Sequence, residues 1–264
     1  GSAIAQANLG VMYQNGEGVP QDYTKAVEQY LQAADQGHAE GQCRLGVMYD
    51  YGKGVPQDYS KAIKWYLKAA NQGHVIAQYN LGVMYGNGKG VPHNYAEAVG
   101  WFLKAGNQGL VEALYCLGAM YENGKVVPQD DSKAVKYYVM AANQGYVEAQ
   151  YNLGVRYENG KGVPQDDSKA VEWYLKAADQ GHVEAQYNLG VKYENGKGVP
   201  QDYSKAIKWY LKAAEQGDAN GQYNLGFMYG YGKGVPQDHL KAKKWWTKAV
   251  KQECTNTQHH LGAM

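Results

Sequence analysis

One stretch of 36 residues decides the fold. Residues 75–110 read VIAQYNLGVMYGNGKGVPHNYAEAVGWFLKAGNQGL. Ala77, Leu81 and Tyr85 are four residues apart, which is the spacing of side chains on one face of an α-helix. The sequence therefore predicts a first helix that runs from Val75 to about Tyr85.

The rest of the stretch predicts a loop and a second helix. Gly88 and Gly90 are suited to positive φ angles, and Pro92 cannot stand in the interior of a helix. Asn94 is a favourable N-cap residue. We therefore expect a second helix from Ala96 to about Gln108.

The same plan recurs along the chain with a step of 36 residues. The dipeptide Leu-Gly begins at Leu9, Leu45, Leu81, Leu117, Leu153, Leu189, Leu225 and Leu261. The seven prolines are Pro20, Pro56, Pro92, Pro128, Pro164, Pro200 and Pro236. Chance does not place every proline on one lattice, so the period is a property of the fold. The predicted repeats are 3–38, 39–74, 75–110, 111–146, 147–182, 183–218 and 219–254, with a partial helix at 255–264.

A helix pair of this kind cannot bury its apolar face alone, so neighbouring pairs must stack to form a continuous core. Small residues recur where the helices would approach closely, as at Gly82 and Ala98. No segment alternates with the period of two that is typical of a half-buried strand. The sequence predicts an all-α fold, a right-handed superhelical solenoid of about seven 36-residue helix–loop–helix repeats.

Composition excludes several classes of protein. Hydrophobic residues make up 44% and charged residues 19% of the chain, as in folded rather than disordered proteins. The net charge of +1 argues against nucleic-acid binding driven by bulk charge. No run approaches 18 apolar residues, so we expect no membrane insertion. The 3 cysteines form no CxxC pair, which argues against a disulfide framework.

Three recurring segments carry a resemblance to a known family. AQYNLGV at 77–83, GKGVPQD at 52–58 and KAIKWYLKAA at 61–70 are similar to the Sel1-like repeat, a longer relative of the tetratricopeptide repeat. The similarity covers essentially the whole chain. It implies a role as an adaptor or scaffold, and an inner concave groove lined by the first helix of each repeat. The paired cysteines of the family's cysteine-rich branch are absent.

The implied groove carries a row of tyrosines, two residues before the Leu-Gly pair in most repeats. They are Tyr79, Tyr115, Tyr151, Tyr187 and Tyr223. An exposed tyrosine offers a large contact area and a hydrogen-bonding tip, and it loses little entropy on binding. Aromatic residues at helical spacing also commonly serve packing between neighbouring helices. Peptide binding and packing both remain open for this row.

Polar residues beside the tyrosines complete the candidate groove. Asn80, Asn152 and Asn188 can clamp an extended peptide or bridge neighbouring helices. In tetratricopeptide relatives, asparagines and basic residues of the inner helices hold a ligand's carboxylate. Arg156 and Lys192, which replace methionine, are therefore further candidates for partner contact.

The middle repeats place glutamates at the start of the first helix, at Glu112, Glu148 and Glu184. A partner with basic side chains would be steered to this acidic stretch. The alternative is that these glutamates are ordinary solvating charges, because single exposed ion pairs contribute little.

No catalytic or metal-binding constellation is readable, since nearly every polar residue belongs to a repeated set. The glycine-rich loops lack the spacing of a phosphate-binding loop. We expect no enzyme activity, no cofactor, no metal and no nucleic-acid partner. The predicted function is a non-catalytic adaptor that binds a protein or extended peptide in the concave groove. The alternative is a structural, immunity or secretion-system component that binds a folded partner through its convex face or loops.

The remaining expectations concern the whole chain. Residues 1–264 are expected to form a single repeat domain, and Gly1-Ser2 to be the remnant of a tag. We expect a monomer, with end-to-end stacking of the terminal repeats as an alternative. The resemblance to this family implies a periplasmic or secreted bacterial protein, and a cytoplasmic location is the alternative.

Overall fold

The computed structural model describes residues 1–124 and 129–251, and these residues form fourteen helices and no strand. The first helices of the repeats are α1 (Ala3–Asn15), α3 (Ala39–Tyr51), α5 (Val75–Asn87), α7 (Val111–Asn123), α9 (Val147–Asn159), α11 (Val183–Asn195) and α13 (Ala219–Tyr231). The second helices are α2 (Tyr23–Asp35), α4 (Tyr59–Asn71), α6 (Tyr95–Asn107), α8 (Asp131–Ala142), α10 (Asp167–Asp179), α12 (Tyr203–Glu215) and α14 (His239–Val250). The predicted all-α repeat fold is confirmed, while the expected partial helix at 255–264 lies outside the described residues.

The third repeat shows that local sequence sets the helix ends. Helix α5 ends at a C-cap glycine, Gly88, with φ of 65°, and Gly90 in the same loop has φ of 72°. Helix α6 begins after Asn94, whose Oδ1 accepts a hydrogen bond from the Glu97 N–H at 3.1 Å. Both features are as the glycine and N-cap spacing predicts.

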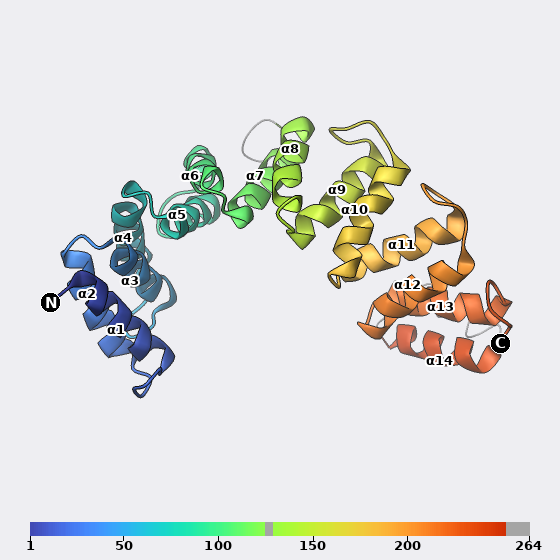
Figure 1. Ribbon diagram of the computed structural model, residues 1–264, viewed down its shortest axis with the longest axis horizontal. Helices are drawn as coiled ribbons and strands as arrows, with labels where there is room; N and C mark the ends of the chain where they lie inside the picture. The colour runs from blue at the N-terminus through green and yellow to red at the C-terminus, as the bar shows by residue number, and fades with distance from the viewer. Residues whose placement is uncertain (125–128, 252–264) are drawn as a thin grey trace. The chain divides into compact units, whose positions relative to one another are not determined.

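The described helices form two compact units. The first comprises Gly1–Gln129 with helices α1 to α7, and the second begins at Asp130 and holds α8 to α14. Within each unit, each helix packs on the helix that follows it in the chain, so that helix pairs of successive repeats are stacked. The order of the helices within each unit can be followed by colour in Figure 1.

The core consists of the same few positions in each repeat. Leu189, Ala206 and Tyr210 of the sixth repeat are fully buried, and so are their counterparts in the second repeat, among them Tyr66. The glycine after each leucine makes room for this ring, since a Cβ atom at Gly46 would lie 2.7 Å from Tyr66. The predicted close approach of the two helices is therefore confirmed at this glycine.

Buried glutamines join neighbouring repeats, a feature that the sequence analysis missed. Gln186 donates to the carbonyl oxygen of Ala178 in the preceding repeat at 3.1 Å and accepts from Gln216 at 2.8 Å. The same inter-repeat bond to an alanine carbonyl is made by Gln42, Gln78, Gln150 and Gln222. A buried carbonyl left without a donor is costly, so each glutamine fixes the register of two stacked repeats.

Candidate partner-binding surface

The predicted tyrosine row lies half-buried in both units, at Tyr79, Tyr115, Tyr151, Tyr187 and Tyr223. Tyr151 shows how such a ring is held: it stacks at 4.4 Å on His182, the N-cap residue of α11, and it lies 5.9 Å from the Tyr174 ring. Burial raises the pKa of Tyr151, and the nearby charge of Glu184 adds to this. The ring is thus fixed by packing and keeps part of its surface open.

The asparagines at the following position are also half-buried, at Asn80, Asn152 and Asn188. In the second unit the Asn188 side chain acts on Tyr151 and Tyr174 and opposes the rise in the pKa of both hydroxyls. This interaction spans two repeats and supports the interpretation that the asparagine bridges neighbouring helices. Tyr151, His182 and Asn188 therefore form one ordered group on α9 and α11.

Arg156 and Lys192 are not where the sequence analysis expected them. Their exposed fractions are only 3% and 2%, so neither faces an open groove. Arg156 Nη1 lies 2.9 Å from Asp131 Oδ1. Lys192 Nζ lies 2.5 Å from Asp167 Oδ1 and 2.8 Å from Glu158 Oε1. The prediction that these two side chains contact a partner is wrong, because both are paired inside the protein.

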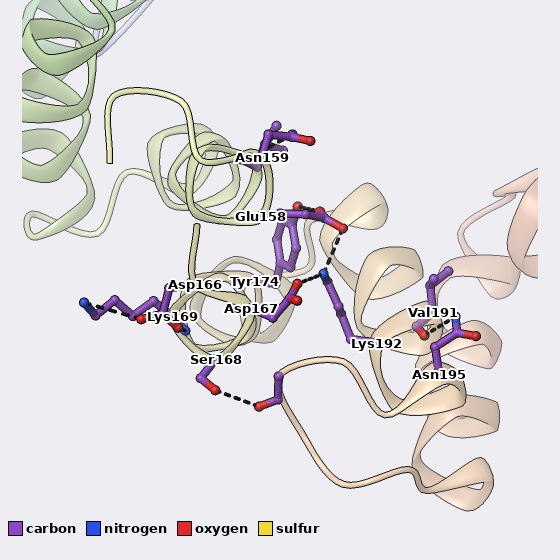
Figure 2. Close-up of polar contacts among 12 residues, drawn as sticks. Glu158, Asn159, Asp166, Asp167, Ser168, Lys169, Tyr174, Val191, Lys192 and Asn195 are labelled. Carbon is purple, nitrogen blue, oxygen red and sulfur yellow. Dashed lines mark hydrogen bonds and ion pairs between the residues drawn. The ribbon is translucent and has the colours of Figure 1, made fainter. Parts of the chain in front are cut away.

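Figure 2 shows the group around Lys192. Burial alone would lower the pKa of Lys192, but its hydrogen bonds to Asp167 and Glu158 outweigh this and raise the pKa. Tyr174 completes the group, because its hydroxyl donates to Glu158 Oε2 at 2.6 Å. A buried ammonium is tolerated only when carboxylates compensate it in this way.

The predicted acidic residues differ in exposure. Glu148 and Glu184 are exposed, and the Glu184 side chain keeps 65% of its surface. Glu112, in the first unit, is half-buried, and its Oε2 has no hydrogen-bond partner among the residues that the structure describes. Since Arg156 and Lys192 are buried, the exposed charged side chains of α9 and α11 are glutamates.

A charged cluster in the first unit was not predicted as a site. Glu40 Oε1 lies 2.5 Å from Arg44 Nε, and Glu40 Oε2 lies 2.8 Å from His74 Nε2. His74 Nδ1 accepts the Ala77 N–H at 3.3 Å, so the ring proton is on Nε2 and is donated to Glu40. The hydrogen bond from His74, and then the charge of Arg44, lower the pKa of Glu40 to about 2.

This cluster predicts a specific pH dependence. A carboxyl whose pKa is lower in the folded than in the unfolded protein stabilises the fold above its unfolded pKa, and the effect is lost on acidification. For Glu40 that window runs from 4.5 down to about 2. We expect the difference in unfolding free energy between wild type and Glu40→Gln to shrink across this window, measured by urea denaturation. Glu148→Gln, which changes an exposed carboxylate, is the control, and a difference that stays constant would contradict the assignment.

Two negative findings apply to the described residues, 1–124 and 129–251. No helix among them is long and apolar enough to span a bilayer. No group of three His, Cys, Asp or Glu side chains is placed there to hold a metal ion.

Comparison with known proteins places these repeats in a family. The Sel1 repeat matches residues 3–38, 39–74, 75–110, 111–146, 147–182, 183–218 and 219–254. A protective antigen of uropathogenic Escherichia coli strains, with an SLR fold, has 39% identity and a TM-score of 0.94 over 99% of this chain. A Sel1 repeat protein from Oxalobacter formigenes has 39% identity and a TM-score of 0.80, also over 99% of this chain.

The chain is shorter than both of these structures, covering 56% of the antigen and 75% of the Oxalobacter protein. Among curated proteins, none matches. Within each unit the matched repeats agree with the stacked helix pairs. The chain belongs to the Sel1 repeat family, whose solenoid fold is commonly used for protein interaction and is typically non-catalytic.

Proposed function

We propose that this protein is a non-catalytic adaptor that binds an extended peptide or a partner loop with basic side chains. The binding surface is the open face of α9 and α11, which we call the first-helix surface and define by Glu148, Tyr151, Glu184 and Tyr187. One observation carries the proposal: the glutamates of this face are exposed, while the basic residues of the same helices are buried in ion pairs.

The tyrosines support the same function. Tyr151 and Tyr187 are packed against Tyr174 and Tyr210, each with ring centroids 5.9 Å apart. A ring held in this way loses little conformational entropy on binding, and tyrosine combines apolar area with a polar tip. The ring contacts also mean that removing these side chains would weaken the fold. Charge reversal of the exposed glutamates is therefore the cleaner test.

We expect the double substitution Glu148→Lys/Glu184→Lys to weaken peptide binding by about 10-fold, because attraction is replaced by repulsion at two exposed positions. The probes are twelve-residue peptides selected on the wild-type protein by phage display, with affinity measured by fluorescence anisotropy. We expect basic residues to be enriched among the selected peptides, and binding to weaken as salt increases.

The matched control is Glu172→Lys/Glu215→Lys, which makes the same charge change at exposed positions of α10 and α12. The control should leave affinity within about twofold of wild type. Failure to select any peptide, or equal losses in both variants, would contradict binding at the first-helix surface.

A second candidate surface is favoured by a separate observation. Lysines lie over tryptophan rings along the second helices, with Lys176 over Trp173 at 3.8 Å and Lys212 over Trp209 at 4.0 Å. The same pairing occurs at Lys68 and Trp65, Lys104 and Trp101, and Lys248 and Trp245. A folded partner could dock on this regular array, as a structural, immunity or secretion-system component would require. Loss of binding in the second-helix control variant alone would favour this candidate.

The setting that we propose is a bacterial protein exported from the cytoplasm. It is supported by the likeness to a protective antigen present in uropathogenic Escherichia coli strains.

A further inference from the structure

A pocket of about 320 Å³ opens in the first unit between α5, α6 and α7. Its walls include Gly86 of α5, Phe102 of α6, and Tyr115, Cys116, Ala119 and Met120 of α7. Most of these side chains are apolar, and Tyr115 belongs to the predicted tyrosine row. None of the features described so far accounts for it.

The pocket exists because the third repeat lacks side chains that fill the same place in other repeats. In the fifth repeat this place holds Glu158 and the Tyr174 hydroxyl, joined at 2.6 Å. The sixth repeat has the same pair, Glu194 and Tyr210, at 2.7 Å. In the third repeat the corresponding residues are Gly86 and Phe102, so the carboxylate and the hydroxyl are both missing.

The seventh repeat shows that the glycine alone does not make a pocket. Gly230 corresponds to Gly86, but the larger Trp246 takes the place of the tyrosine, and its ring would lie 3.0 Å from a Cβ atom at Gly230. Phe102 is smaller than tryptophan, and a Cβ atom at Gly86 would meet only the Ala98 methyl, at 3.7 Å. The small side chains at both positions, Gly86 on α5 and Phe102 on α6, therefore leave the space open.

Helix α7 enlarges the same space. Ala119 stands where α9 and α11 have Val155 and Val191, and Cys116 stands where they have asparagine. Burial raises the pKa of the Cys116 thiol to about 11, so this wall is uncharged near neutral pH. The pocket thus accepts an apolar group and offers little to a charged one.

An acidic side chain of α7 lies close to one wall of the pocket. Glu112 lies one helical turn before Cys116 on α7, and its charge acts on the Cys116 thiol. One of its carboxylate oxygens, Oε2, is buried without a hydrogen-bond partner in the described part of the chain. Helix α5 carries no charged side chain, and the charged residues of α7 are both glutamates. Helix α6 carries Glu97 and Lys104, and the Lys104 ammonium lies over the Trp101 ring at 3.7 Å. A positively charged group on a ligand would complement Glu112.

We propose that this pocket is a specificity site for an extended segment of a partner protein, which inserts one aromatic side chain and places a basic side chain beside Glu112. The inference rests on the adaptor function proposed above and extends it to the first unit. One helical turn advances about 5.4 Å, and alternate residues of an extended chain are about 6.6 Å apart on one face. The aromatic and basic residues of the ligand are therefore separated by one residue.

The test uses the full chain and two fluorescein-labelled nonapeptides, centred on Phe-Ser-Arg and on Arg-Ser-Phe, since either chain direction satisfies the spacing. We expect one of them to bind, with affinity falling at least about 10-fold when its phenylalanine is changed to alanine. The variant Gly86→Glu/Phe102→Tyr copies the Glu158 and Tyr174 pair and fills the pocket. It should weaken binding at least about 10-fold.

Three further variants make the result specific. Ala119→Leu fills the space from α7 and should cause a similar loss even if the double variant folds poorly. Glu112→Gln should weaken binding about threefold and reduce its salt dependence. Gly100→Ala should change nothing, because a Cβ atom added at Gly100 would have no neighbouring atom within 4 Å.

Binding that survives in the filled variants, or the absence of binding by both peptides at about 1 mM, would overturn the pocket assignment. The adaptor function is tested separately, at Glu148 and Glu184 with selected peptides. Its failure can therefore be distinguished from failure of the pocket assignment. If charge reversal weakens binding of the selected peptides but filling the pocket does not weaken nonapeptide binding, the adaptor function is supported and only this site is rejected.

Discussion

We expect replacement of Asp167 by tyrosine to destabilise the protein by about 2–3 kcal/mol, and Lys192→Met in the same chain to restore most of the loss. Asp167 Oδ1 lies 2.5 Å from Lys192 Nζ, which is 3% exposed as a side chain. Without Asp167, only Glu158 is left to compensate the buried ammonium. A tyrosine at position 167 would in addition compete with the lysine stem for space.

The restoration is expected because other repeats already contain this combination. In the last two repeats the corresponding residues are Tyr203 and Met228, which pack together in one apolar cluster. Glu194 there keeps its bond to Tyr210 at 2.7 Å, so the acidic residue does not need a lysine. Replacing a buried ion pair by well-packed apolar side chains is often neutral or stabilising. The double variant should lie within about 1 kcal/mol of wild type.

Urea unfolding of wild type, both single variants and the double variant gives the coupling energy directly. Lys192→Met alone should cost about 1–2 kcal/mol, less than a fully buried pair, because the Asp167 and Glu158 side chains are 33% and 37% exposed. Lys169→Met is the control, since Lys169 is 55% exposed and pairs with Asp166 at 3.5 Å. Strictly additive effects of the two substitutions would contradict the pairing.

These residues also show where the sequence was sufficient and where it was not. Spacing alone predicts the helix pair of each repeat, the N-cap at Asn94 and the loop glycines Gly88 and Gly90, because these features depend on neighbours in the chain. Placing Arg156 and Lys192 requires knowing which residues of the previous repeat face them. The signal was present: aspartates replace tyrosines at 131 and 167, in step with the two basic residues.

The pocket could not be predicted from one helix or one repeat. It depends on the side-chain volumes that α5, α6 and α7 contribute together. Gly86 resembles other glycines near the ends of helices, and its effect becomes visible only when Phe102 is compared with the larger Tyr174 and Trp246 at the equivalent positions. A helical wheel likewise could not predict how much of each tyrosine in the row is exposed. A helical wheel gives the direction of Tyr151 on α9, but it does not show that the ring of His182, at the start of α11, stacks on it.

Gly198→Ala should destabilise the second unit strongly, with an expected loss of about 2–4 kcal/mol. Gly198 has φ of 75°, a conformation that costs an alanine roughly 1 kcal/mol. The new methyl would also overlap the carbonyl oxygen of Asp167 and lie 2.9 Å from the Ser168 nitrogen. Figure 2 shows why this loop is held so close: Ser168 Oγ donates to the Gly198 carbonyl oxygen at 3.2 Å.

Gly217→Ala separates the two contributions, because Gly217 has φ of 96° and a Cβ atom added there would meet nothing within 4 Å. It should lose only about 1 kcal/mol, the cost of the backbone conformation. The difference between the two variants in urea unfolding therefore measures the contact between the loop after α11 and the start of α10. This contact joins consecutive repeats beside the Asp167–Lys192 pair, so disturbing it should also weaken that pair. Equal losses in the two variants would mean that backbone conformation, not the approach of neighbouring repeats, requires glycine at this position.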